Sequence, residues 1–583
     1  MTIAKSILLV DNDNSVLDAL ALSLGRRGYK VSKANSVERA QSLFNKNIFH
    51  LGIVDLRLED DSKQADTSGF DVAKTLSPHM PCMIYTAYED RDNVRRAFSE
   101  VGAKEVVSKN SQYAARELVN AVDHLFQSDV KVNFDLEIEG DIDRLIELVG
   151  KLQIPEADEE TRPSEEDIRQ ILQTLFYDRS IIKIGLEPIF QPKHPSETPV
   201  LPRNNTVLVK VRPYFKYGSG LPVVVKFGWW KKVDEEFDHY RRLKPFLGGQ
   251  QLTVLEGPAY SRKIGGLIYT FVGAGERVSL QPLRDIILWD SAESVIKLLE
   301  QFFEQTFGPI FADATREEID LTASYTQRLG LTPQKLQTAA ASFQAELLTD
   351  EVITIDGLAE TFKNPITWIL SETNEFRQFE VFSRTSLIHG DLNSHNILVD
   401  QFKNFWLTDF AQAGEFHALY DFISLEADIK FNLLPLDNLE ALFEFEIRFL
   451  SPTTYEDNGS NIFFEREGLN KAGQIILSLR RLASDLINLR SDMRAYYQAL
   501  LFYSLNVLCT ASDGTEMTNA KKRYALLSAA LLCERLESWP TWQRSTPKVD
   551  TNVTATLSSK SKTNDSSISA KIQKFVGNIL GRN

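Results

Sequence analysis

Between residues 7 and 109, four short apolar runs of strand length each end in a polar side chain. The runs alternate with stretches of helical period, a βαβ pattern that predicts a parallel sheet with helices on both faces. In such sheets the ligand site lies beyond the carboxyl ends of the strands. The polar residues at those ends are Asp11, Asp55, Thr86 and Lys109. We therefore expect these four side chains to converge.

The chemistry of these residues predicts a phosphoryl site that depends on a metal ion. Carboxylates gathered at strand ends repel one another unless a cation lies between them, and hard oxygen ligands of this kind suit Mg²⁺. A lysine and a hydroxyl beside them could hold a phosphoryl group carried on one carboxylate. The alternative, in which Asp11 and Asp55 only cap helices or turns, leaves the convergence from four strands unexplained.

The segments ILLVDND, IVDLRLED, IYTAYED and GAKEVVSK, with their spacing, resemble the receiver domain of two-component response regulators over residues 5 to 127. The resemblance implies a doubly wound α/β fold of the CheY-like kind. It also implies that Asp55 accepts a phosphoryl group from a sensor histidine kinase or phosphotransfer protein. Asp11 and Asp55 would hold Mg²⁺, Thr86 would contact a phosphoryl oxygen, and Lys109 would pair with the acylphosphate.

Three positions depart from the pattern of that family. Asn12 stands where a second acidic residue is usual, which removes one negative charge and predicts weaker Mg²⁺ binding. Asn110 replaces the usual proline after the lysine, and Val106 lies where an aromatic switch residue is common. Asn12 leaves open a receiver that dimerises independently of phosphorylation.

A second set of polar residues lies in the segment HGDLNSHN, residues 389–396, and in the segment LTDFA, residues 407–411. Asp391, Asn396 and Asp409 place two carboxylates and an amide oxygen around one space. Lys226 ends an apolar run, and a helix expected to begin near Val233 offers Glu236, or as a fallback Glu235, to pair with it. Phosphoryl transfer from ATP needs residues of these kinds: a carboxylate that orients the attacking hydroxyl, ligands for Mg²⁺, and a lysine that contacts the phosphates.

These motifs resemble the protein-kinase-like superfamily, in its aminoglycoside and choline phosphotransferase branch, over residues 170 to 540. The resemblance implies a two-lobed α+β fold, Asp391 as catalytic base, Asn396 and Asp409 as Mg²⁺ ligands, Lys226 on the phosphates of ATP, and residues 269–274 as the hinge near adenine. A receiver followed by such a domain resembles signalling proteins whose effector is a kinase-like, ternary-complex-associated domain.

The nucleotide lid is the main departure in this second part. Glycines should let a hairpin close on phosphates, but the region before Lys226 contains only Gly185, Gly218 and Gly220, and four prolines lie in residues 191–205. Two functions therefore stay open: a phosphotransferase-like enzyme regulated by the receiver, and a pseudokinase that binds a nucleotide or partner without catalysis. His389 is more plausibly a brace of the loop than a reactive group.

The predicted domains are a receiver (1–127), an acidic linker with a short helix (128–163), an N-lobe (164–275), a helical C-lobe (276–543) and a basic tail (544–583). Ser164 begins a helix-start signal of the capping kind, and helices are expected over 475–489, 493–508 and 520–536. The tail is expected to be disordered, or to form a short helix that contacts a membrane surface or a partner.

Composition excludes several classes of protein. A net charge of −15 argues against a broad nucleic-acid surface. No apolar run approaches the roughly 18 residues that a membrane-spanning helix needs, and the N-terminus lacks the pattern of a signal peptide, so we expect a cytoplasmic protein. Three cysteines in apolar surroundings predict neither a disulfide framework nor a Cys-rich metal site.

Overall fold

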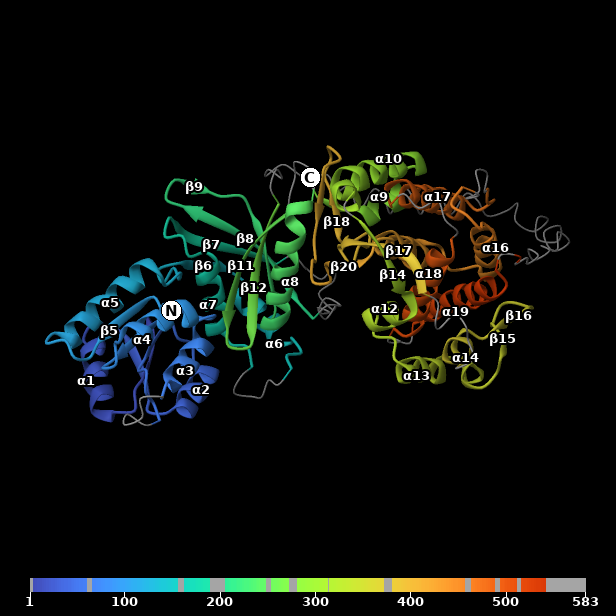
Figure 1. Cartoon of the computed structure of the whole chain (residues 1–583). Helices are drawn as coiled ribbons and strands as arrows, with labels where there is room; N and C mark the ends of the chain where they lie inside the picture. Colours follow the sequence, from blue (N-terminus) through green and yellow to red (C-terminus); the bar gives the residue numbers. More distant parts are fainter. Residues whose placement is uncertain are drawn as a thin grey trace. The chain divides into compact units, whose positions relative to one another are not determined.

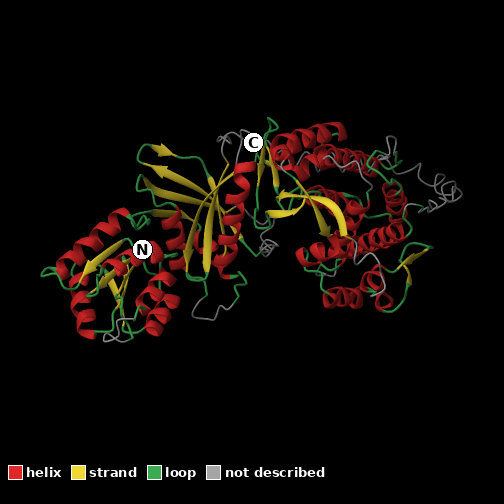
Figure 2. Cartoon of the chain, in the orientation of Figure 1, coloured by secondary structure: helices red, strands yellow, loops and turns green. Residues whose placement is uncertain are grey.

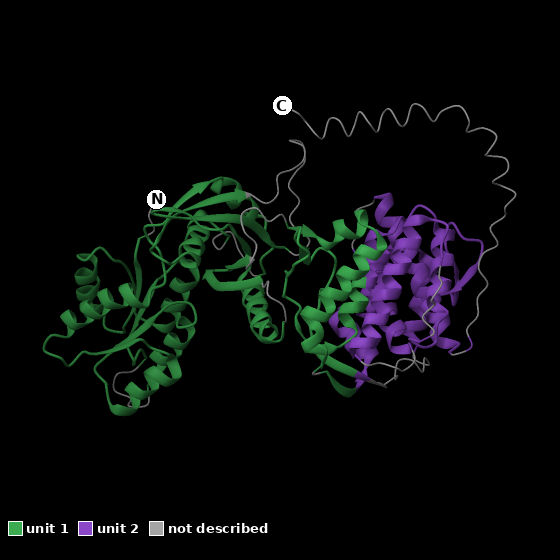
Figure 3. Cartoon of the chain, turned by 90° about the horizontal axis from the view of Figure 1, so that it is seen from above, with its two compact units in different colours: residues 1–317, 384–425 green, residues 318–383, 426–583 purple. Residues whose placement is uncertain are grey.

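The computed structural model describes residues 4–59, 66–155, 162–188, 205–247, 253–271, 280–312, 314–371, 380–456, 463–487, 493–510, 515–539 and 541 (Figure 1). The chain is divided into two compact units (Figure 3). The first comprises residues 1–317 and 384–425, and the second comprises residues 318–383 and 426–583. The tail from residue 544 and residues 272–274 of the expected hinge lie outside the described residues.

The N-terminal part of the first unit is a five-stranded parallel sheet in the order β2-β1-β3-β4-β5. Its strands are β1 (Ser6–Val10), β2 (Lys30–Ala34), β3 (Leu51–Val54), β4 (Cys82–Thr86) and β5 (Glu105–Ser108). Its helices are α1 (Asn14–Gly25), α2 (Val37–Lys46), α3 (Ser68–Leu76), α4 (Arg91–Arg96) with a π-helical turn (Ala97–Val101), and α5 (Ala114–Ser128). The expected doubly wound order is confirmed by this strand arrangement and by the helices.

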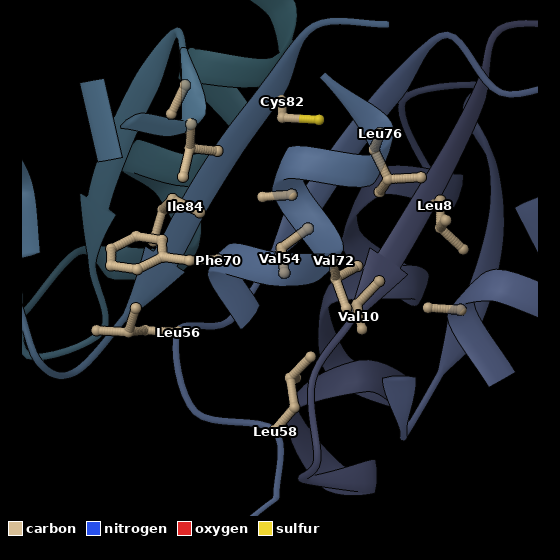
Figure 4. Packing of buried hydrophobic residues seen from close by; sticks show 14 of the residues in the cluster. Leu8, Val10, Val54, Leu56, Leu58, Phe70, Val72, Leu76, Cys82 and Ile84 are labelled. Atoms are coloured by element: carbon tan, nitrogen blue, oxygen red, sulfur yellow. The ribbon is translucent and has the colours of Figure 1, made fainter. Parts of the chain in front are cut away.

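Both faces of this sheet are buried, because successive side chains of a strand point to opposite sides. On one face Leu8 and Val10 pack with Val54, Phe70 and other residues of α2, α3 and β4 (Figure 4). On the opposite face Ile7 and Leu9 pack against α1 and α5. Every residue of β1, β3 and β4 is buried, which is why these strands read as continuous apolar runs.

A second sheet in the first unit follows the order β11-β12-β10-β8-β7-β6, with β9 paired to β8. Its strands are β6 (Glu137–Gly140), β7 (Ile181–Pro188), β8 (Val207–Phe215), β9 (Gly218–Ser219), β10 (Val223–Trp229), β11 (Thr253–Ser261) and β12 (Ile264–Phe271). Its helices are α6 (Ile142–Gly150), α7 (Glu165–Leu175) and α8 (Trp230–Leu243), with a 3₁₀ turn (Lys244–Phe246). A capping box of Ser164 and Asp167 begins α7, at the expected start signal.

Residues 128–163, which we expected to be an acidic linker, belong in large part to this second sheet domain instead. Strand β6 pairs in parallel with β7, and Leu145, Val149 and Leu152 enter the same hydrophobic cluster as residues of α7, β8 and β10. Acidic side chains on the open face of β6 gave the sequence the appearance of a linker, because one apolar residue, Ile138, is too little for a strand signal.

The rest of the first unit carries short strands around the segment 389–411. Strand β18 pairs with β13 and β19, and β17 pairs with β20. The elements are β13 (Gln281–Pro282), α9 (Leu283–Trp289), α10 (Ala292–Phe302), a π-helical turn (Phe303–Phe307), α11 (Gly308–Ala312), β14 (Thr315–Asp320), β17 (Glu380–Ile388), β18 (Ile397–Val399), β19 (Phe405–Leu407), β20 (Gly414–His417) and α15 (Tyr420–Asp428).

The second unit is mainly helical (Figure 2). It contains α12 (Leu321–Arg328), α13 (Pro333–Phe343), a 3₁₀ turn (Ala345–Leu348), β15 (Val352–Thr354), β16 (Thr361–Lys363), α14 (Pro365–Leu370), a π-helical turn (Ile429–Leu433), α16 (Leu439–Leu450), α17 (Glu467–Ile487), α18 (Arg494–Leu508) and α19 (Glu516–Glu537). The three C-terminal helices overlap the ranges that the apolar period predicted, although α17 begins at Glu467, eight residues before the expected start. Among the described helices, none combines the length and the apolar character that crossing a membrane requires.

Candidate functional site

The four polar residues at the strand ends of the first sheet meet, as expected. The Nζ atom of Lys109 lies 2.6 Å from Oδ2 of Asp55 and 2.7 Å from Oδ2 of Asp11. Thr86 ends β4, and its backbone carbonyl accepts a hydrogen bond from the N–H of Lys109 at 2.8 Å. Asp11, Asp55 and Thr86 are each at most 3% exposed. Three strand ends and the loop after β5 therefore supply one buried polar cluster.

Burial and pairing act in opposite directions on this cluster. Burial raises the pKa of the Asp55 carboxyl, although the Lys109 ammonium beside it opposes the rise. Burial alone would lower the pKa of Lys109, but the two carboxylates outweigh it and raise that pKa. The ammonium group therefore stays charged and neutralises part of the charge of the two carboxylates.

Gly69, the second residue of α3, fits directly against Asp55. A Cβ atom at this position would lie 1.9 Å from the backbone oxygen of Asp55 and 2.8 Å from that of Leu56. The N–H of Gly69 donates to the backbone oxygen of Leu56 at 3.0 Å. The start of α3 is thus held against the residue expected to accept the phosphoryl group, and only glycine leaves room for this approach.

The donor set of the cluster fits Mg²⁺, because two buried carboxylates offer oxygen ligands on one side of the lysine. Oδ1 of Asp11 accepts from the N–H of Asp13 at 3.0 Å, and Oδ1 of Asp55 accepts from the N–H of Leu56 at 2.7 Å. Asn12 follows directly and is half-buried. In the described part of the chain no group of three or more His, Cys, Asp and Glu side chains is arranged to hold a metal ion.

The second polar cluster forms around Lys226 on β10. Its Nζ lies 2.8 Å from Oε2 of Glu236 on α8 and 3.2 Å from Oδ1 of Asp409. Lys226 and Glu236 are 5% and 2% exposed. The hydroxyl of Tyr269 on β12 donates to Glu236. Burial alone would lower the pKa of Lys226, but the two carboxylates raise it, so this lysine keeps its charge.

Asp391 and Asn396 lie in one loop, where Asn396 stabilises the loop from within. Its Nδ2 donates to the backbone oxygen of Asp391 at 2.8 Å and to Oδ2 of Asp391 at 3.1 Å. The carboxylate of Asp421 on α15 accepts from the N–H groups of His389 at 2.7 Å and of Gly390 at 2.9 Å. Burial, reinforced by the negative charge of Asp409, raises the pKa of Asp391 to about 7.

His389 braces this loop. Its Nε2 lies 3.1 Å from the backbone oxygen of Thr408, and its ring packs 5.3 Å from that of Phe410. The Phe410 ring packs in turn 5.2 Å from Tyr240 on α8. Burial lowers the pKa of His389, so its ring is neutral at physiological pH. These contacts connect the loop of Asp391, the segment of Asp409 and the helix of Glu236.

The residues around the first cluster match a known family model. Residues 7–123 match the response regulator receiver domain. These residues form a receiver domain. The matched range contains the five-stranded sheet from Ile7 onward, the four residues at its strand ends, and Gly69.

Relatives of the receiver domain occur in longer regulatory proteins. Alginate biosynthesis transcriptional regulatory protein AlgB of Pseudomonas putida is 33% identical over 106 residues, which are 18% of this chain and 22% of that protein. Photosynthetic apparatus regulatory protein RegA of Rhodobacter capsulatus is 28% identical over 121 residues, 20% of this chain and 61% of that protein. The chain thus spans less than two thirds of the length of either relative.

Among solved structures, the non-phosphorylated HemR receiver domain of Leptospira biflexa is 28% identical, with a TM-score of 0.18 over 21% of this chain and 93% of that one. Outside the receiver domain, residues 334–508 match the family model of ternary complex associated domain 9. This range includes Asp391, Asn396 and Asp409. The chain therefore joins a receiver domain to a ternary complex associated domain.

The structure places the other expected residues as follows. Glu236, and not the fallback Glu235, pairs with Lys226, while Glu235 pairs with Lys232 at the surface. Tyr269, the first residue of the expected hinge, contacts Glu236, to which its hydroxyl donates. Gly218 begins β9, where it pairs with Phe215 of β8, and Gly220 follows β9, where its N–H donates to the oxygen of Pro213 at 2.8 Å. Most of residues 191–205 lie outside the described part.

Sequence reasoning missed the contacts that link the receiver domain to the second sheet. His50, before β3, bonds to Gln170 on α7, and His79, before β4, packs against Trp230 on α8. These residues come from turns and helix faces far apart in the chain, and no local pattern marks them. The burial of Gln170, which marks one of these contacts, is visible only in the structure.

Proposed function

We propose that the chain is a two-component signalling protein in which phosphorylation of Asp55 regulates a phosphotransferase-like effector that depends on Mg²⁺ and ATP. The observation that carries the effector part is the convergence on Lys226: this buried ammonium pairs with Glu236 on one side and with Asp409 on the other. A buried lysine paired with a helix glutamate, beside an aspartate that can bind a metal ion, is the arrangement that orients phosphates in phosphoryl transfer.

In the receiver domain the carboxylate of Asp55 would attack the phosphoryl group of a sensor histidine kinase or phosphotransfer protein, and the donor nitrogen would leave. Asp11 and Asp55, with Asn12 beside them, would hold Mg²⁺, which offsets the charge of the phosphoryl oxygens. Lys109 would then pair with the acylphosphate, and the hydroxyl of Thr86 would contact one of its oxygens.

In the effector Asn396 and Asp409 would hold Mg²⁺, and Lys226 would contact the phosphates of ATP, which supplies the transferred group. Asp391 would orient the attacking hydroxyl and take its proton. Its pKa of about 7 supports this role, because a general base works best with a pKa near the working pH.

A pseudokinase is the second candidate, and the glycines before Lys226 favour it. A Cβ at Gly185 on β7 would lie 3.2 Å from the ring of Tyr214, so this glycine serves packing between strands. Gly218 belongs to β9, where it pairs with Phe215 of β8, and Gly220 directly follows β9. In that case the second domain binds a nucleotide or a partner under control of the receiver, without transfer.

Two variants of the full chain separate these candidates by calorimetry with Mg²⁺-ATP. Asp409→Ala removes a metal-coordinating charge and should weaken binding, whereas Asp391→Ala should spare binding and abolish transfer or hydrolysis, because Asp391 acts only in the chemical step. Lys226→Ala should resemble Asp409→Ala more mildly. A wild type without Mg²⁺-dependent nucleotide affinity down to millimolar would establish the pseudokinase.

The receiver part is tested separately with acetyl phosphate and Mg²⁺. The wild type should acquire a phosphoryl label that alkali and hydroxylamine remove, as expected for an acyl phosphate, and Asp55→Asn should lose it. An unchanged label on Asp55→Asn would refute the assignment of Asp55.

A further inference from the structure

The receiver domain contacts the second sheet domain through the edge where its strands begin. His50 precedes β3 and His79 precedes β4, while Asp55 and Thr86 lie at the opposite ends of these strands. The contacts border a groove of about 560 Å³, which is lined by the receiver domain, α7 and residues 258–263 of β11 and the following turn. The edge opposite the phosphoacceptor is therefore the one that faces the effector.

The first contact is a buried hydrogen bond between His50 and Gln170 on α7. Nδ1 of His50 accepts from the backbone N–H of Ser6 at 3.0 Å, so the proton of the neutral ring lies on Nε2. Nε2 then donates to Oε1 of Gln170 at 2.9 Å. Burial lowers the pKa of His50 to about 4, so the ring is neutral near pH 7. This contact anchors the receiver domain to α7.

The second contact is aromatic and reaches α8. The ring of His79 lies 5.8 Å from Trp230, the first residue of α8, and 5.9 Å from Tyr260 on β11, with the ring planes nearly perpendicular in both pairs. The hydroxyl of Tyr260 donates to Asp234, one helical turn after Trp230. Since residues four apart lie on one helix face, Trp230 and Asp234 present a single surface to the receiver domain.

The same helix carries Glu236, the partner of Lys226. Val233 lies on α8 between Trp230 and Glu236. It packs tightly on β12, as shown by Gly265 of that strand, where an added Cβ would lie 3.0 Å from the Val233 side chain. A helix packed this closely moves as a rigid rod, so a displacement of its first turn also displaces Glu236. The position of Trp230 therefore affects the distance between Glu236 and Lys226.

Two elements connect His79 back to Asp55. Helix α3 begins at Ser68–Gly69 against the backbone of Asp55 and ends at Leu76, whose oxygen accepts from the N–H of His79 at 2.9 Å. Strand β4 begins shortly after His79 and ends at Thr86 in the Asp55 cluster. The turn at residues 77–80 thus joins the far ends of the two elements that touch the phosphoacceptor.

We propose that this turn transmits the state of Asp55 to α8 through the contact of His79 with Trp230 and Tyr260, and so sets the position of Glu236 beside Lys226. The proposal rests on the proposed phosphorylation of Asp55, but not on the use of ATP. It assigns the output surface of the receiver domain to the edge where its strands begin, with α8 as its partner within the chain.

Hydrogen exchange of the full-length protein, with and without beryllofluoride and Mg²⁺ as a phosphoryl mimic, tests the proposal. In the wild type the mimic should change the exchange rates of amides in both the Thr86–Tyr88 segment and α8, in α8 by about fivefold or more, the lower range of coupling between sites. In His79→Ala the Thr86–Tyr88 segment should still respond and α8 should not.

Matched variants make the result specific. His124→Ala, an exposed histidine on α5, should respond like the wild type, and Trp230→Phe, which keeps a ring, should retain part of the response of α8. Two results would overturn this proposal but not the proposed function. One is a wild type in which the Thr86–Tyr88 segment responds and α8 does not, and the other is an undiminished response of α8 in His79→Ala. A wild type in which neither segment responds overturns the receiver part of the proposed function and the inference with it.

Discussion

The ammonium group of Lys109 bridges the buried carboxylates of Asp11 and Asp55. Asn12, which follows Asp11 in the chain, carries no charge. The usual second acid of receiver domains would add a third negative charge beside Asp11 and Asp55. We therefore expect the side chain at position 12 to set how strongly the cluster attracts a divalent ion, because ligand charge sets affinity for hard cations.

Asn12→Asp should tighten Mg²⁺ binding by about tenfold, since it restores a carboxylate to a site of two. Mg²⁺ titration followed by calorimetry measures the change. Asn14→Asp is the matched control, because it adds the same charge at an exposed position of α1 and should change the affinity little. Equal effects of the two substitutions would show that position 12 does not face the metal.

The raised pKa of Asp391 predicts a specific dependence of stability on pH. An acid whose pKa is higher in the folded state stabilises the protein below its unfolded pKa of about 4 and loses that contribution as the pH rises through about 7. Asp391→Asn stays neutral, so its free energy of unfolding relative to the wild type should increase by about 2 to 3 kcal/mol between pH 5 and pH 8.

Urea denaturation at pH 5, 6, 7 and 8 measures this difference. A constant difference across this range would mean that the carboxyl of Asp391 titrates normally. If the chain is active, its rate at low Mg²⁺-ATP should rise over the same pH interval, because only the ionised carboxylate accepts a proton.

At the scale of elements, α8 distinguishes two adjacent glutamates by the face on which each lies. Glu236 faces β10 and is buried with Lys226, whereas Glu235 is half exposed and pairs with Lys232 at 2.9 Å. The sequence analysis preferred Glu236 and kept Glu235 as the fallback, and the pairing of Glu236 with Lys226 agrees with that order. The start of the helix was expected near Val233, but α8 begins at Trp230.

Glu236→Ala should destabilise the first unit by about 3 to 5 kcal/mol, because it leaves the buried charge of Lys226 with Asp409 alone. Glu235→Ala should change the free energy of unfolding by about 0.5 kcal/mol or less, as expected for an exposed pair. Urea denaturation compares the two variants. Similar losses in both would contradict the buried pairing of Glu236.

The start of α3 offers a second test, because Gly69 has no room for a side chain. Gly69→Ala forces a Cβ onto the backbone oxygen of Asp55 and should cost about 2 to 3 kcal/mol. Gly25→Ala, at the end of α1 with no atom within 4 Å of the added Cβ, should be neutral or stabilise by up to about 1 kcal/mol. Thermal denaturation of the receiver domain distinguishes them, and a neutral Gly69→Ala would refute the close approach.

The features that could be predicted from the sequence are those marked by a strong local pattern, either a polar residue at the end of a strand or an apolar period along a helix. The convergence of Asp11, Asp55, Thr86 and Lys109 followed from parallel strands alone, and α17 to α19 followed from their apolar period. Strand β6 and the contacts of His50 and His79 did not, because they depend on pairing between distant segments. Whether the second part is a two-lobed kinase-like fold stays a prediction.

At the scale of the whole molecule, the receiver domain extends beyond the expected boundary at residue 127. Val130 and Val132 are buried in its core cluster, and Phe134 packs against His50 and Phe126. The chain leaves the receiver domain only after these contacts are made.

A receiver domain that ends at residue 127 should therefore be less stable than one that ends at residue 134, by about 3 kcal/mol for the two valines. Urea denaturation of the two fragments measures the difference. Equal stability would place Val130 and Val132 in the second sheet domain instead.

The order of segments along the chain has a consequence for synthesis on the ribosome. The first unit requires residues 384–425, but residues 318–383 of the second unit are made before them. The receiver domain can fold as soon as it emerges, whereas Lys226 and Glu236 must wait for Asp409, which arrives after part of the other unit. A nascent chain arrested before residue 409 would hold a complete receiver domain and a Lys226–Glu236 pair that still lacks Asp409, so the two polar clusters are completed at different times during translation.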